Sequence, residues 1–152
     1  MATRDELYAK FGITAEAAQL FETEIGTLLL CARGLESGWH VVPDGTSGRD
    51  LLGEIDRSTL GRLLTKLNRH VEIDDNLSAS FASALAARNR LNHGFYERHN
   101  FRIQTDDGRD VMMADLDALH DELFAAWRLA GAMTSLASEV IVRERERGNR
   151  TA

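Results

Sequence analysis

The chain has very little proline or cysteine and no long apolar run, and each of these scarcities excludes a class of structure. Among its 152 residues, Pro43 is the only proline and Cys31 the only cysteine. One cysteine cannot form an intramolecular disulfide, and one proline leaves nearly the whole chain free to form helices. The longest apolar run, residues 28–32, is far shorter than the roughly 20 residues needed to span a bilayer. We therefore expect a helical protein without a membrane span.

The chain also lacks an excess of positive charge. It carries 18 Lys and Arg against 24 Asp and Glu, a net charge of −6, whereas proteins that coat nucleic acid without specificity are usually basic. A local basic site is still compatible with this balance. Residues 1–10 are charged and lack the apolar core of a signal peptide, so we expect a cytoplasmic protein. The length predicts a single domain over residues 1–152, with residues 1–13 and 148–152 frayed.

Apolar residues recur with helical spacing in four segments. These are residues 14–35, 59–70, 77–95 and 111–147, and the last segment carries an apolar stripe that continues through Leu136 and Val140. Residues 36–57, with Pro43 and several glycines, are typical of a long loop. Residues 97–110 are expected to form a polar connection with a turn at Asp107–Gly108. The predicted fold is all-α, a four-helix up-and-down bundle with a long loop between helices 1 and 2.

The third predicted helix carries the most suggestive group of side chains, Arg88, Asn89 and His93, and is expected to end at Gly94. Asn89 and His93 are four residues apart, which places them on one helix face. The long stem of Arg88 can bring its guanidinium near the same site. Arginine binds phosphate oxygens bidentately, and histidine transfers protons near neutral pH. The group therefore suits a phosphodiester.

A plainer interpretation of the same residues stays open. A histidine at a helix C-terminus interacts favourably with the helix dipole, and glycine is the usual residue just beyond a helix. Arg88 would then be a surface residue. This interpretation explains His93 and Gly94 well, but it leaves Asn89 unexplained, because asparagine is a poor helix former away from helix ends.

The sequence Arg88-Asn89-x-x-x-His93-Gly94 resembles the signature of HEPN-domain ribonucleases. In that family an arginine, a polar residue, three variable residues and a histidine lie near the end of the third main helix. Residues 58–64 also look like a helix of HEPN relatives, and the resemblance extends from about residue 15 to residue 145. It implies an all-α homodimer that cleaves RNA without a metal or cofactor, at a cleft where two copies of the motif face each other.

The resemblance also implies a role for each motif residue. Arg88 would bind the scissile phosphate, His93 would act as general base or acid, and Asn89 would orient the imidazole or the phosphate. Attack by the ribose 2′-OH restricts the substrate to RNA and yields a 2′,3′-cyclic phosphate. Further residues would contact the RNA or line the cleft: Arg90, Tyr96, Arg98, His99 and Arg102.

HEPN ribonucleases of this kind act as toxins or defence effectors, so an antitoxin protein is an expected partner. In one branch of the family a tyrosine two residues after the histidine is modified by the antitoxin. Here Phe95 holds that position and Tyr96 comes next, which argues against a tyrosine-modifying antitoxin. The alternative function is a non-catalytic HEPN-like module that binds a protein or a nucleotide. The sequence has no Cys/His zinc motif and no glycine-rich phosphate loop.

Overall fold

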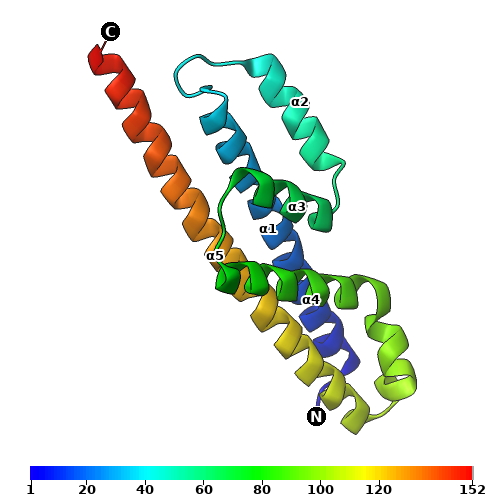
Figure 1. The fold of residues 1–152 in the computed structure, drawn as a ribbon. Coiled ribbons are helices and arrows are strands. Elements are labelled where there is room, and N and C mark those ends of the chain that lie inside the picture. Colours follow the sequence, from blue (N-terminus) through cyan, green and yellow to red (C-terminus); the bar gives the residue numbers. More distant parts are fainter. Residues whose placement is uncertain (152) are drawn as a thin grey trace. The chain divides into compact units, whose positions relative to one another are not determined.

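The computed structural model describes residues 1–151, and every regular element in that range is helical (Figure 1). The elements in chain order are α1 (Arg4–Glu36), α2 (Gly45–Asp56), α3 (Leu60–His70), α4 (Asp75–His99), the 3₁₀ helix η1 (Asn100–Gln104) and α5 (Asp106–Thr151). The prediction of an all-α protein is confirmed. Within these residues, no helix combines the length and the apolar character that crossing a membrane requires.

The segment predicted as a long loop, residues 36–57, contains helix α2. Asp44 caps this helix, since its Oδ1 accepts a hydrogen bond from the Ser47 backbone N–H at 3.0 Å. Leu51 is buried and gives the helix an apolar contact. The glycines suggested a loop because each costs a helix about 1 kcal/mol relative to alanine. Capping and packing outweigh that cost here, so residues 1–151 contain five α-helices instead of the four expected.

Helix α1 begins ten residues earlier than the expected cap at Thr14. Thr14 instead lies inside the helix, fully buried, and its hydroxyl donates to the Lys10 carbonyl at 2.8 Å. Leu7 is also fully buried, so the first turns of the helix pack against the core. Residues 4–13 are therefore helical.

The connection around residue 100 also differs from the sequence prediction. Helix α4 continues through Gly94 to His99, so the predicted helix end at Gly94 is wrong. Residues 100–104 form η1, and α5 starts at Asp106. Thr105 caps α5 by accepting a hydrogen bond from the Gly108 N–H at 3.1 Å. Asp107 and Gly108 thus belong to the first turn of α5 and do not form a separate turn.

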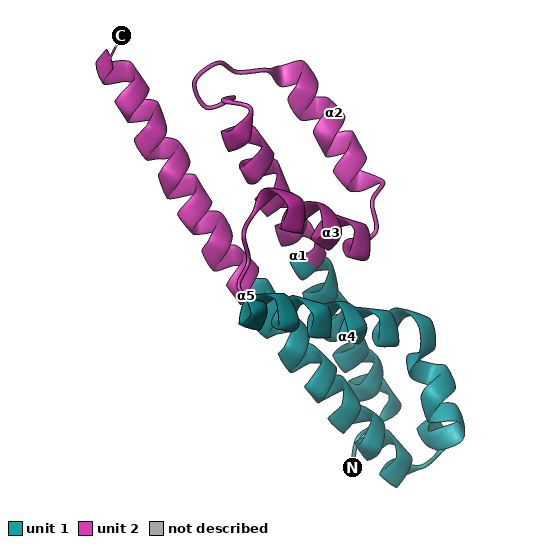
Figure 2. Ribbon diagram, in the orientation of Figure 1, with its two compact units in different colours: residues 1–21, 75–127 teal, residues 22–74, 128–152 magenta. Residues whose placement is uncertain are grey.

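The chain divides into two compact units, shown in different colours in Figure 2. The first unit consists of residues 1–21 and 75–127, and the second of residues 22–74 and 128–152. Helices α1 and α5 each supply residues to both units, and the single domain expected from length stays a prediction. The largest fully buried side chains of the first unit are Leu7, Phe21, Leu91, Met112, Leu116, Leu119 and Leu123, and those of the second are Ile25, Leu29, Leu60, Leu63 and Leu67.

Candidate functional site

The motif residues lie in the interior of α4, within the first unit. Asn89 and His93 are exposed, and Arg88 is half-buried. The Arg88 Nη1 donates a hydrogen bond to the Asn89 Oδ1 at 3.3 Å. Because Asn89 and His93 share a helix face one turn apart, this bond ties the guanidinium to the face that carries the imidazole. The arrangement presents a cation, an amide and a proton-transfer group on accessible surface.

The helix-dipole interpretation of His93 is not compatible with this placement. His93 lies six residues before the last residue of α4, which is about 9 Å of helix rise. The dipole acts within the last turn of a helix. Gly94 lies within the helix as well, so it does not end it. Neither residue is therefore explained by helix termination.

We expect Gly94→Ala to raise the free energy of unfolding by about 1 kcal/mol, because glycine is a poor helix former. A Cβ at Gly94 would meet nothing within 4 Å. Thermal unfolding should show a Tm higher by about 2–4 °C. The matched control is Gly108→Ala, whose Cβ would lie 2.1 Å from the Arg102 carbonyl oxygen, so its Tm should fall. A lower Tm for the Gly94 variant would contradict the open space on this side of α4.

A polar network around one buried histidine lies at the end of α4. His99 is only 4% exposed, and its Nε2 lies 2.8 Å from Asp115 Oδ2 in α5. Arg90 Nη2 donates to the other carboxylate oxygen, Oδ1, at 2.7 Å. Arg102 Nη1 lies 3.4 Å from His99 Nδ1, so that nitrogen accepts while Nε2 donates to Asp115. One carboxylate thus joins the end of α4 to α5.

The charge state of Asp115 follows from these contacts. Partial burial acts to raise the pKa of its carboxyl. The hydrogen bond from His99, together with the charge and hydrogen bond of Arg90, outweighs burial and lowers the pKa below its ordinary value of 3.8. Asp115 is therefore ionised at neutral pH. No spacing pattern pointed to this role of Asp115, because it lies 16 and 25 residues from its partners in the chain.

The remaining predicted site residues have different surroundings. Arg98 and Arg102 are exposed. Tyr96 is 40% exposed, and its ring lies 5.2 Å from that of Phe11 and 5.3 Å from that of Phe95. Partial burial raises the pKa of the Tyr96 phenol. His99 is buried within the Asp115 network, which argues against its contact with RNA.

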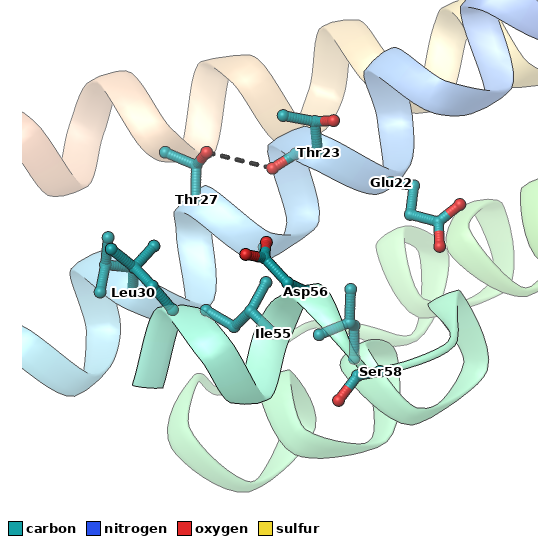
Figure 3. Close-up of a pocket in the computed structure, with 10 residues that line it drawn as sticks. Glu22, Thr23, Thr27, Leu30, Ile55, Asp56 and Ser58 are labelled. Atoms are coloured by element: carbon teal, nitrogen blue, oxygen red, sulfur yellow. Dashed lines mark hydrogen bonds between the residues drawn. The ribbon is translucent and has the colours of Figure 1, made fainter. Parts of the chain in front are cut away.

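A separate pocket lies within the second unit, between α1, α2 and α3 (Figure 3). Its volume is about 280 Å³, and its lining includes the carboxylates of Glu22 and Asp56. Helices α1 and α2 approach closely here, since a Cβ on Gly26 would lie 2.8 Å from Ile55 Cγ2. The pocket contains none of the predicted site residues. The motif of α4 is thus a surface site and not the lining of this pocket.

Comparison with known proteins supplies no relative: no family model, curated protein or solved structure matches this chain. Within residues 1–151, no group of three or more His, Cys, Asp or Glu side chains is placed to hold a metal ion. The functional assignment therefore depends on the motif, its placement in α4 and the chemistry of its side chains.

Proposed function

We propose that this chain is a metal-independent endoribonuclease of the HEPN type, acting on RNA as a homodimer. The observation that carries the proposal is the hydrogen bond from Arg88 to Asn89, 3.3 Å long, on the exposed helix face that also bears His93. A guanidinium, an amide and an imidazole on one accessible surface suit a phosphodiester. The sequence resemblance to HEPN ribonucleases points to the same three residues.

The proposal includes a HEPN-like arrangement of the helices. The four helices predicted from the sequence correspond to α1, α3, α4 and α5, and α2 is an additional helix in the long connection between the first two. In this arrangement α4 is the third of the four helices predicted from the sequence, and it carries the motif, as the third main helix does in the family. The motif of this chain lies further from the helix end than the family pattern implies.

The proposed reaction needs one base, one acid and one cation. The imidazole of one His93 accepts the proton of the ribose 2′-OH while the 2′-oxygen attacks phosphorus. The bond from phosphorus to the 5′-oxygen breaks, and the His93 of the second copy donates a proton to that oxygen. Arg88 stabilises the additional negative charge that develops on the phosphate oxygens. The products are a 2′,3′-cyclic phosphate and a 5′-hydroxyl.

The proposed reaction requires a second copy of the chain and an RNA substrate as partners. A second copy of the chain completes the cleft, and RNA lies across it. The exposed Arg98 and Arg102 would contact the RNA backbone, and Tyr96 would line the cleft. Arg90 would contact the RNA through the 40% of its side chain that remains exposed beside Asp115. As a toxin or defence effector, the protein would be neutralised by an antitoxin protein.

The test is incubation of the purified protein with end-labelled RNA in excess chelator. We expect cleavage that continues without divalent metal, with cyclic phosphate and 5′-hydroxyl ends identified by enzymatic end-labelling and mass spectrometry. Gel filtration should show a dimer. Absence of cleavage across unrelated RNA substrates, or products with 5′-phosphate ends, would overturn the proposal.

The second candidate function is non-catalytic nucleotide binding. The observation that favours it is a groove of about 590 Å³ within the second unit, a volume typical of ligand sites. Its lining includes Trp39, His40, Arg145 and Asn149, which offer aromatic surface, a cation and an amide to a nucleotide. This candidate predicts no RNA cleavage and no toxicity on expression, so the same assay separates the two functions.

A further inference from the structure

We propose that Phe101 is a stacking platform for an unpaired base, which makes single-stranded RNA the substrate class of the site in α4. The inference rests on the proposed ribonuclease function. Phe101 is 75% exposed and is the most exposed aromatic side chain among residues 1–151. It lies in η1, immediately after the helix that carries the motif. Phe101 follows His93 by eight residues, so the ring belongs to the segment directly after the motif.

The backbone just before Phe101 adopts a conformation that is uncommon for its residue type. Asn100 has a φ of 49° and is the only non-glycine residue with positive φ among residues 1–151. Asparagine tolerates this left-handed region better than most residues. Residues held in sparsely populated conformations cluster at ligand sites. Here the left-handed residue ends α4 and turns the chain so that Phe101 is exposed.

The backbone just after Phe101 is held firmly. Arg109 Nη1 donates to the Ile103 carbonyl at 2.9 Å, and Arg4 Nη2 donates to the Gln104 side chain at 2.8 Å. Gly108 lies so close to Arg102 that a Cβ would be 2.1 Å from the Arg102 carbonyl oxygen. An exposed ring on a fixed backbone loses little conformational entropy when a ligand stacks on it.

The charges around Phe101 favour a nucleic acid strand over an apolar peptide. Arg98 and Arg102 are exposed on either side of it in the sequence. Exposed aromatic rings combined with arginines are the usual means by which proteins bind single strands without reading their sequence. Asp106 is paired with Arg109, and the exposed Asp107 that follows it in α5 would repel phosphates. We therefore expect the strand to run from Phe101 toward Arg98 and the motif.

The experiment measures RNA binding in the His93→Ala background, in which the proposed cleavage is blocked. Fluorescence anisotropy with a labelled single-stranded oligoribonucleotide should show that Phe101→Ala weakens binding about 5- to 100-fold. Phe101→Trp should retain the affinity, and its fluorescence should be quenched on binding. Phe124→Ala is the matched control, because Phe124 is a partly exposed aromatic residue in α5 outside this surface, and its affinity should not change.

Three results would overturn the platform. These are unchanged affinity in Phe101→Ala, equal loss of affinity for a double-stranded RNA of the same sequence, and full recovery in Phe101→Leu. The last result would indicate an apolar contact with a protein. The stacking role of Phe101 and the proposed nuclease activity can be disproved independently. Cleavage that does not depend on Phe101 removes the platform alone, whereas Phe101-dependent binding without cleavage by the wild-type protein removes the nuclease alone.

Discussion

Replacing His93 with alanine is expected to lower the rate of RNA cleavage by about 10²- to 10⁴-fold, the usual contribution of a general acid or base. The loss should appear in kcat, because the imidazole acts on protons that move in the transition state. His93 is exposed within α4, and alanine is the best helix former, so the variant should keep its fold. Single-turnover cleavage of labelled RNA measures the rate, and circular dichroism checks the fold.

The matched control is Asn92→Ala, since Asn92 is the exposed neighbour of His93 on the same helix. Its cleavage rate should stay within a few-fold of wild type. Arg88→Lys keeps the positive charge but loses the bidentate geometry. Its cleavage rate should therefore lie between the rates of Asn92→Ala and His93→Ala. Equal rates in wild type and His93→Ala would remove the catalytic role of His93 and leave a helical protein of unassigned activity.

Sequence patterns correctly predicted helices in which buried residues recur at the helical period. Leu63, Leu64 and Leu67 follow the helical period over residues 59–70, and all are buried in α3. The same reasoning failed at α2, where glycine suggested a loop although Asp44 and Leu51 supply a cap and a buried contact. Local composition shows how much a glycine destabilises a helix, but it does not show how much tertiary packing stabilises that helix.

The stripe of α5 shows a second limit of periodicity. The pattern continues through Leu136 and Val140, yet these side chains are 62% and 44% exposed. No residue from 131 to 151 is buried, so the apolar stripe stays at least partly accessible along this part of α5. Helical spacing predicts which face is apolar, but only the neighbouring elements decide whether that face is covered.

The candidate site could be predicted only in part, because spacing in the sequence determines contacts within a helix but not contacts between helices. The spacing of Asn89 and His93 fixes their shared face, since one helix contains both. The network of His99, Arg90 and Asp115 joins residues of two helices, and no spacing rule connects them. His99 was accordingly predicted as an RNA contact, whereas the fold gives it a buried position beside Asp115.

Replacing Asp115 with asparagine is expected to lower the free energy of unfolding by about 2 kcal/mol at neutral pH. An amide cannot accept from both donors as the carboxylate does, so either the buried His99 or the half-buried Arg90 loses its acceptor. This expected loss of free energy is smaller than the loss from breaking a fully buried ion pair, because the Asp115 side chain is 20% exposed. Urea unfolding measures the difference, and Tm should fall by about 4–8 °C.

The pH dependence of this difference tests the mechanism. The folded state lowers the pKa of Asp115 below 3.8, so its stabilisation is fully present above that pH and is lost as pH falls through the folded pKa. The gap between wild type and Asp115→Asn should therefore be largest at neutral pH and should narrow as the pH falls below 3.8. Asp117→Asn is the control on the same helix: Asp117 is 60% exposed and pairs with Lys10 at 2.6 Å, so its loss should cost at most about 1 kcal/mol. A gap for Asp115→Asn that is no larger than for Asp117→Asn would show that the carboxylate does not hold α4 to α5.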